Sequence, residues 1–358
     1  MNVDRKLLIR LIVRAVIIAG GMSLVLYFSA PGRMAGKQKQ TQAILFSSMS
    51  TFASAQLTAS KKDYSFEPAF ETVREELKRA ERICNYFSPE SELGRLNATA
   101  ADAPFACSNE LWKVLTIARE WHKKTDGAFD ITITPLMNLW GFYVKEKKVP
   151  SEAEITETMK LVGLDKVKFD DEAKTVFFPV KGMSLNLGGI AKGWALDRAV
   201  NAVQALHPEI TEGFLNLGGN VLAFGGIFKG GVRDPFDRNR VCATTEIKGN
   251  CAMSTSGTAE RFVEIDGKKY GHIIDPRTGY PVDHCFSATV LAESAVLSDV
   301  LSTALFVNGF SFAAKIPENP VLLIRRDSKN PDRLEVLQTG DCWTLDLPVT
   351  IPEPVKGQ

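Results

Sequence analysis

An aspartate and a threonine lie at positions i and i+4 in a stretch of mostly small and apolar residues. Asp299 and Thr303 belong to SDVLSTALF, residues 298–306, where Val300 and Ala304 are among their neighbours. On a helix this spacing places both oxygen-bearing side chains on one face. A carboxylate and a hydroxyl are hard oxygen ligands of the kind that Mg²⁺ takes, usually completed by water and phosphate. The pair is a candidate magnesium site; the alternatives are a hydrogen bond between the two side chains or solvent exposure.

The letters LNLGG occur twice, at residues 185–189 and 215–219. Each copy predicts a short apolar strand that stops at a glycine pair. The first copy continues into IAKGWALDRAV, whose apolar residues have helical spacing. A helix that starts directly after such a turn can present backbone N–H groups to a phosphate, and Lys192 would add a mobile positive charge. The alternative is two tight strand ends that need glycine for positive φ.

His272 ends a predicted strand in GHIIDPRTGYPVD, residues 271–283. A histidine beside a rigid turn is a candidate proton-transfer group, because its unperturbed pKa lies near neutrality. A structural role is the alternative. Two further segments, residues 87–97 and 127–136, mix aromatic, small and polar residues, as the lip of a ligand cleft or ordinary turns would.

Hairpins and helices must bring these segments together. Strands that group in hairpins, with helices that do not alternate regularly with them, favour an α+β fold over a doubly wound sheet. We expect two intimately packed lobes of hairpin-rich sheet and helices, with the ligand cleft between them. Periodicity and turn residues predict helices at 70–84, 111–118, 151–162, 190–206 and 295–307, a strand region at 43–60, hairpins at 175–178 with 183–187 and at 261–265 with 268–274, and late strands at 321–325 and 333–337.

The N-terminus differs from the rest of a chain of ordinary composition. The 358 residues are 45% hydrophobic with a net charge of +1, so no basic excess is available for a nucleic-acid partner. Basic residues precede the apolar run 15–30. Residues 1–30 therefore predict an anchor in the inner membrane that leaves the rest of the chain on the exported, periplasmic side, with a cleaved signal peptide as the alternative. We expect a linker at 31–42, the main domain at 43–350 and a tail at 351–358.

Six cysteines are present. An exported location permits disulfides between them, in many possible pairings. There is no CxxC pair, so a zinc or dithiol motif has little support. Buried thiols are the alternative.

Five segments in this order, together with Asp299 and Thr303, resemble the ApbE-type FAD:protein FMN transferases. They are SPESELGRLN, GAFDITITP, LNLGGIAKG, STSG and HIIDPRTGYP, and the match runs from about Met49 to Gly309. The resemblance implies a magnesium-dependent transfer of FMN from FAD onto a threonine of an acceptor protein, with AMP as the leaving group. It also implies acceptors that are exported or membrane-bound parts of electron-transfer proteins.

The resemblance assigns roles by position. The carbonyl of Gly189 with the side chains of Asp299 and Thr303 would hold Mg²⁺, and His272 would act as the base for the acceptor threonine. Ser256 and Gly257 would line the same cleft. The FAD contacts would be Met49, Phe87, Ala128, Phe129, Asp130, Asn186, Lys192, His272 and Ile273.

Three positions depart from the family's pattern. Phe87 stands where many members have tyrosine, Asn186 where aspartate is frequent, and Ser50 where glycine is usual. Two other functions use the same residues: hydrolysis of FAD to FMN and AMP, and passive binding of FAD. A nicotinamide dehydrogenase is not favoured, because no GxGxxG follows a predicted strand.

Overall fold

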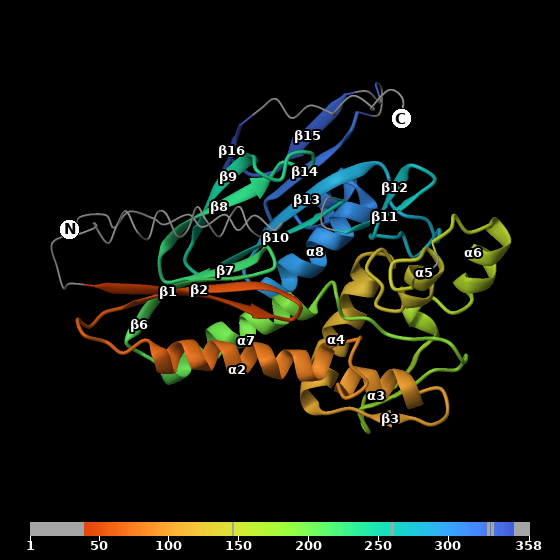
Figure 1. The fold of residues 1–358 in the computed structure, drawn as a ribbon, viewed down its shortest axis with the longest axis horizontal. Coiled ribbons are helices and arrows are strands. Elements are labelled where there is room, and N and C mark those ends of the chain that lie inside the picture. The colour runs from red at the N-terminus through yellow and green to blue at the C-terminus, as the bar shows by residue number, and fades with distance from the viewer. Residues whose placement is uncertain (1–38, 145–146, 259–260, 328–329, 331–332, 347–358) are drawn as a thin grey trace, which may run out of the picture.

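An antiparallel sheet of eight strands forms the centre of the molecule (Figure 1). The computed structural model describes residues 39–144, 147–258, 261–327, 330 and 333–346. Each strand pairs with its neighbours in antiparallel register. The sheet order is β1 (Gln40–Ser48), β2 (Thr51–Ala59), β6 (Ile210–Leu217), β7 (Asn220–Phe224), β10 (Cys251–Gly257), β13 (Cys285–Ala292), β14 (Val321–Arg326) and β15 (Leu334–Gln338).

Three helices cover one face of this sheet: α2 (Glu67–Cys84), α7 (Ala191–Leu206) and α8 (Ala295–Asn308) (Figure 1). Their apolar side chains and the inward-facing residues of the strands form the largest core. Helix α8 is buried nearly all round, which is typical of a helix enclosed by other elements. Its polar residues Ser298, Asp299 and Ser302 are therefore inside the protein, where polar groups need partners.

A small sheet lies against the opposite face (Figure 1). Its order is β16 (Trp343–Leu345), β9 (Val241–Lys248) and β8 (Ile227–Arg233). Side chains from both sheets, such as Phe228, Ile247 and Met253, form a second core between them. The central sheet is thus covered on both faces, and its middle strands alternate little between buried and exposed positions.

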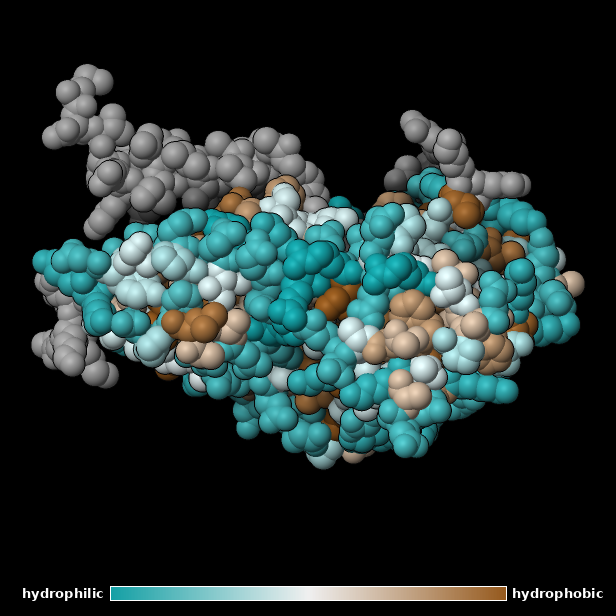
Figure 2. All heavy atoms as spheres, turned by 90° about the horizontal axis from the view of Figure 1, so that it is seen from below, coloured by the Kyte–Doolittle hydropathy of each residue, from teal (hydrophilic) through white to brown (hydrophobic). Residues whose placement is uncertain are grey.

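A mostly helical region stands at one end of the central sheet (Figure 1). Its third core packs Leu136 and Trp140 against Ile155 and Ile274, so the segment after His272 is part of it. The face seen from below in Figure 2 is largely hydrophilic, with small separate apolar areas. The region contains the helices α3 (Glu92–Thr99), α4 (Asn109–Lys124), α5 (Thr134–Leu139) and α6 (Glu152–Met159), the 3₁₀ turn η1 (Leu164–Lys166), and the short strands β3 (Phe105–Ala106), β4 (Lys168–Asp170) and β5 (Thr175–Phe177). The hairpin of β11 (Phe262–Ile265) and β12 (Lys268–Gly271) lies beside it. A second 3₁₀ segment, η2 (Phe310–Lys315), follows α8.

Most predicted helices are confirmed, including the capping box of Ser151 and Glu154 that starts α6. The hairpin around Asp266-Gly267 is confirmed, and both turn residues have positive φ. The α+β class is also confirmed, with all the described pairs in the central sheet antiparallel.

Three element predictions are corrected. The strand region 43–60 is a hairpin of two strands, β1 and β2. Residues 175–177 are a strand, but they pair with β3 and β4 instead of with 183–187, which forms no strand. Strand β1 begins at Gln40, so it takes the last residues of the predicted linker 31–42. Sequence periodicity also missed β7, β8, β9, β10 and β13.

The predicted anchor at residues 1–30 and the tail at 351–358 lie outside the described residues. Within the described part of the chain, no helix is both long and apolar enough to span a bilayer.

Candidate functional site

Helix α8 and strand β10 bring the predicted metal ligands next to a serine. The Oγ of Ser256 lies 2.9 Å from the Oγ of Ser302 and 3.3 Å from the Oγ1 of Thr303. One turn earlier, Asp299 is nearly fully buried. Its Oδ2 accepts a hydrogen bond of 3.1 Å from the backbone N–H of Gly193. Three hydroxyls therefore meet between α8 and β10, and the buried carboxylate of Asp299 lies one helical turn away.

The first LNLGG copy supplies the backbone at this point. A Cβ placed on Gly189 would lie 3.5 Å from Thr303 Oγ1 and 3.2 Å from the ring of Phe129. Gly188 and Gly189 are not among the positive-φ glycines. What these positions require is a close approach of the main chain, since a larger residue at Gly189 would crowd the space beside Thr303.

The second LNLGG copy has another role. Gly218 and Gly219 have φ of 60° and 97° and form the tight turn between β6 and β7. The reading of both copies as strand ends that need positive φ is therefore right for the second copy and wrong for the first. The same five letters serve two structural purposes.

Helix α7 starts at Ala191, and no side chain caps its N-terminus. Lys192 in the first turn has its Nζ 3.2 Å from the carbonyl oxygen of Gly188 and 3.9 Å from Asp299 Oδ1. The helix dipole and the ammonium group both favour an anion here. The ammonium group of Lys192 and the carboxylate of Asp299 are therefore adjacent. A site that binds a metal ion together with a phosphate needs a negative and a positive group close to each other.

His272 follows β12 and is fixed by one backbone carbonyl. Its Nδ1 lies 3.1 Å from the oxygen of Arg261. Because a carbonyl can only accept, Nδ1 carries the hydrogen and Nε2 is the basic nitrogen. Burial lowers the pKa of His272 to about 4, and the charges of Arg261 and Lys192 act in the same direction. The imidazole is thus neutral at pH 7 and able to accept a proton.

Three aromatic rings stand on the other side of the Gly188 loop. Phe87 is 62% exposed, and its ring contacts that of Tyr143 edge to face, with centroids 5.0 Å apart. The Tyr143 hydroxyl accepts a hydrogen bond of 3.2 Å from Asn186, whose Oδ1 accepts one of 2.8 Å from Gly188 N–H. Phe87 and Asn186, which are far apart in sequence, are thereby joined.

Comparison with known proteins gives this arrangement a family. The ApbE family model matches residues 49–321. The chain is 33% identical to a FAD:protein FMN transferase of Klebsiella pneumoniae (strain 342) over 68% of this chain and 77% of the relative, and 31% identical to one of Haemophilus influenzae over 73% and 80%.

The chain belongs to the ApbE family. Its fold agrees: the ApbE protein of Thermotoga maritima superposes with a TM-score of 0.73 at 31% identity, covering 83% of this chain and 96% of that one. The flavin transferase ApbE of Vibrio cholerae gives 0.73 at 25% identity, over 84% and 98%. The relatives' shared name is that of a transferase, and membership makes this chain an enzyme of that kind.

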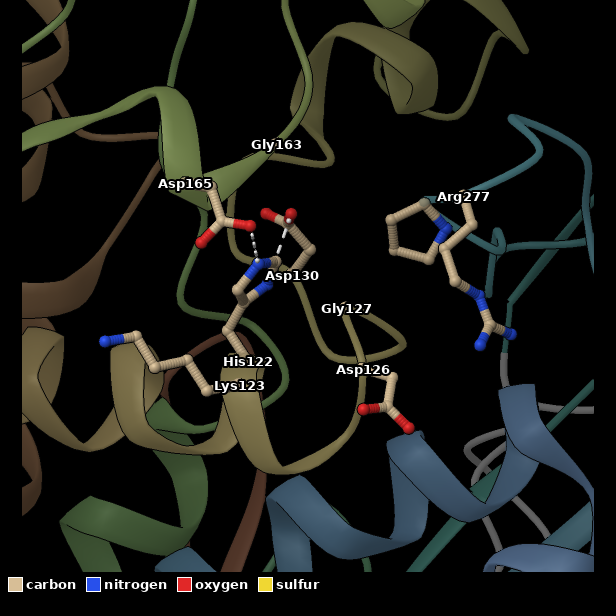
Figure 3. Close-up of a pocket in the computed structure, with 9 residues that line it drawn as sticks. His122, Lys123, Asp126, Gly127, Asp130, Gly163, Asp165 and Arg277 are labelled. Carbon is tan, nitrogen blue, oxygen red and sulfur yellow. Dashed lines mark ion pairs between the residues drawn. The ribbon is translucent and has the colours of Figure 1, made fainter.

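Asp130, one of the predicted FAD contacts, forms its hydrogen bonds with groups of the protein itself. The carboxylate of Asp130 accepts hydrogen bonds from the N–H and hydroxyl of Thr132, at 2.7 and 2.6 Å, and from Leu164 N–H at 3.0 Å. It also faces His122, with 3.4 Å between its Oδ2 and Nδ1 (Figure 3). These bonds fix the loop after Phe129 and use the Asp130 carboxylate inside the protein.

A pocket of about 430 Å³ opens beside this pair. Figure 3 shows His122 pointing between Asp130 and Asp165, with Arg277 across the pocket on a separate segment. Its lining includes none of Gly189, Lys192, Asp299 or Thr303. Within this lining His122 faces Asp130 and Asp165, whereas Arg277 and Asp126 pair with Asp275 and Lys315 outside it. Gly189, Lys192, Asp299 and Thr303 remain the candidate site, because complementary groups converge there.

The remaining predicted contacts differ in their placement. Met49 has a φ of 48° in the turn between β1 and β2, where its N–H lies 3.4 Å from Glu81 near the end of α2. Ala128 and Ile273 are buried. Gly257 ends β10 one residue after Ser256.

Sequence reasoning missed two residues that hold the site. Tyr143 follows Trp140 and Gly141 in a segment without periodicity. Asp197 projects from α7 and accepts hydrogen bonds of 2.8 and 2.9 Å from the N–H groups of Ala295 and Val296, at the start of α8. Burial raises the pKa of Asp197 to about 6. The signal that could have identified Asp197 in the sequence is its position on the same predicted helix, about one and a half turns after Lys192.

The cysteines show no disulfide among the described residues. All six are free thiols. Burial raises the pKa of Cys84, and it raises the pKa values of Cys107 and Cys285 to about 12. The buried-thiol alternative therefore describes Cys84, Cys242 and Cys285, whereas the other three are partly exposed.

Proposed function

We propose that this enzyme transfers FMN from FAD to the hydroxyl of a threonine in an exported acceptor protein, with Mg²⁺ bound and AMP released. The observation that carries the proposal is the convergence of Gly189, Asp299 and Thr303 beside Lys192 and a neutral His272. An acid, an alcohol, an uncapped helix start and a base are the groups that phosphoryl transfer to a hydroxyl needs.

The residues present fit a magnesium ion. The candidate ligands are all oxygens: the carboxylate of Asp299, the hydroxyl of Thr303 and the main-chain carbonyl of Gly189. Among the described residues no three His, Cys, Asp or Glu side chains gather as a metal cluster. A site with one carboxylate leaves coordination positions for phosphate and water. When bound, the ion would supply Lewis-acid stabilisation of charge on the diphosphate.

Substrate binding would use the start of α7. The diphosphate carries the charge that Lys192 and the first N–H groups of this helix attract. The flavin end would extend from there toward Phe87, and the phosphorus that carries FMN would then lie on the side of His272. This orientation brings the bond to be broken between the base and Lys192.

The reaction would start at the acceptor threonine. Its hydroxyl gives its proton to Nε2 of His272 while its oxygen attacks the phosphorus of the FMN half. The bond between this phosphorus and the bridging oxygen breaks, and AMP takes that oxygen away. His272 serves as a base only when neutral, which its lowered pKa secures.

The acceptor and the location belong to the same proposal. Basic residues before the apolar run 15–30 support an inner-membrane anchor with the catalytic part in the periplasm. Acceptors would then be threonine-bearing subunits of exported or membrane electron-transfer proteins.

The test uses the purified protein with FAD, Mg²⁺ and candidate acceptors that carry a threonine. We expect intact-mass spectrometry to show an acceptor heavier by one FMN group, and AMP in equal amount by chromatography. A threonine-to-alanine acceptor is the matched control.

AMP and free FMN without a modified acceptor would favour the hydrolase instead. Full recovery of FAD after long incubation with Mg²⁺ and acceptor would indicate a passive binder. Either result contradicts the transferase proposal.

A further inference from the structure

Tyr86, Phe87 and Tyr143 form a cluster of three rings beside the Gly188 loop. The ring of Phe87 stands nearly perpendicular to both tyrosines, at 83° and 87°, with centroids 5.1 and 5.0 Å away. The two tyrosine rings are 5.7 Å apart and inclined by 31°. Edge-to-face contacts of this kind are favourable beyond the area they bury. The two tyrosines therefore contact the Phe87 ring at a nearly perpendicular angle and help to fix its orientation.

The Phe87 ring is held in place by its neighbours, but most of its surface is exposed to solvent. Its exposed fraction is 62%, although exposing an aromatic ring to water is unfavourable. Its N–H donates to Asn85 Oδ1 at 2.9 Å, which fixes the local backbone. A ring that is oriented by neighbours while its surface remains in water is suited to stacking against a flat ligand.

Tyr143 connects this cluster to the Gly188 loop and to Arg261, whose carbonyl holds His272. Its hydroxyl is bonded to Asn186, which in turn binds the N–H of Gly188, next to Gly189. Its ring centroid lies 5.9 Å from the guanidinium carbon of Arg261, whose carbonyl holds His272. Burial raises the pKa of Tyr143, so its hydroxyl stays protonated.

We propose that Tyr143 is a positioning residue that holds the ring of Phe87 for stacking on the isoalloxazine of FAD and sets it relative to the Gly188 loop. The inference rests on the proposed function in taking FAD as the ligand, with its flavin end at Phe87. Its own content is that the orientation of the Phe87 ring, and with it the affinity for the flavin, depends on Tyr143.

The two halves of FAD test this separately. Dissociation constants for FMN and for ADP, both with Mg²⁺, are measured on the full chain by calorimetry, and flavin fluorescence quenching is followed for FMN. For Tyr143→Leu we expect about tenfold weaker FMN binding with less quenching, as loss of one aromatic stack would give. ADP affinity should change by less than about twofold.

Three variants control the result. Tyr143→Phe keeps the ring and should restore most FMN affinity. Tyr64→Leu removes a tyrosine from another edge-to-face pair, with Phe66, and should leave both affinities unchanged. In a double-mutant cycle, Phe87→Leu combined with Tyr143→Leu should weaken FMN binding little more than either alone, because the two rings act as one unit.

Equal losses for FMN and ADP in Tyr143→Leu would show a general structural role and overturn the proposal. A loss confined to ADP would place the adenine at Phe87 and overturn it too, as would unchanged FMN binding. These readouts involve no acceptor and no turnover. FMN binding that follows the expected pattern in a protein that modifies no acceptor would therefore sink the transferase proposal and leave this one standing.

Discussion

His272 shows how the same residue type acquires its chemistry from its surroundings. His122 lies between two carboxylates, with its Nδ1 3.4 Å from Asp130 and its Nε2 3.5 Å from Asp165. Burial lowers the pKa of His272, and the positive charges of Arg261 and Lys192 lower it further, so these effects outweigh the hydrogen bond to the Arg261 carbonyl, which raises it. The neutral ring is therefore favoured. Sequence alone could not separate the two histidines, because both the carboxylates and the cations come from other elements.

We predict that the acid limb of kcat/KM for the transfer reaction lies near pH 4 and not near 6.5. The pKa of His272 is lowered in the folded protein to about 4, so the base stays competent until that pH. Between pH 6.5 and 4 the unfolded chain binds a proton here that the folded one does not, so stability falls with falling pH. The rate profile of the wild type against His207→Gln, a histidine bonded to Tyr64 and Thr72, checks this; an acid limb near 6.5 in both would contradict it.

The turn between β1 and β2 explains one departure from the family. Met49 and Ser50 have φ of 48° and 58°, in the left-handed region where a side chain costs about 1 kcal/mol or more. We predict that Ser50→Gly stabilises the protein by about 0.5–1 kcal/mol in urea unfolding. Ser47→Gly, within β1 near its end, should destabilise it. Loss of stability in Ser50→Gly would show that the Ser50 side chain has a contact worth more than the strain.

At the scale of elements, the site depends on how closely α7 and α8 approach. Gly193 permits this contact, and its N–H binds Asp299. Asp197, one turn on, binds the first N–H groups of α8. The two helices therefore fix the candidate metal ligands relative to Lys192 through backbone groups.

We predict that Gly193→Ala destabilises the protein by about 2–3 kcal/mol and weakens metal binding, because overpacking moves the backbone. The new Cβ would lie 2.2 Å from the carbonyl oxygen of Ala295, an atom that cannot rotate away. Urea unfolding and Mn²⁺ binding measure the two effects. Asn201→Ala, at an exposed position of α7, should change neither. If Gly193→Ala had the same free energy of unfolding as the wild type, the close packing of α7 against α8 would be refuted.

At the scale of the whole molecule, the site is assembled from distant parts of the chain. Phe87 follows α2, Gly189 precedes α7, Ser256 is the penultimate residue of β10, and Thr303 lies on α8. A ligand that contacts all of them ties together the helical end and the central sheet. Binding should therefore stabilise the fold as one unit.

We predict that FAD and Mg²⁺ together raise the melting temperature by several degrees. Ligand at about 100 times its Kd adds about 2.7 kcal/mol, and each kcal/mol shifts a protein of this size by about 2–4 °C. Either ligand alone should give less. Asp299→Asn should keep the FAD shift and lose the part due to Mg²⁺, whereas Asp283→Asn, at an exposed position, should behave as wild type. An undiminished Mg²⁺ shift in Asp299→Asn would rule out the metal assignment.

The sequence by itself determined what local physics controls. Helical periodicity located α2, α4, α7 and α8, an Asp-Gly turn located the β11–β12 hairpin, and the i, i+4 spacing put Asp299 and Thr303 on one helix face. Ordered motifs also pointed to the family. These features depend on residues that are close to each other in the chain, so they can be predicted from the sequence alone.

Only the tertiary structure decided which segments meet. It showed that one LNLGG copy needs close approach while the other needs positive φ. It also turned the Asp130 carboxylate toward His122, placed Tyr143 between Phe87 and Asn186, and paired β5 with β3 and β4. The physical reason is that burial, close packing and the partner of a polar group are set by atoms that are remote in sequence, and no local pattern records them.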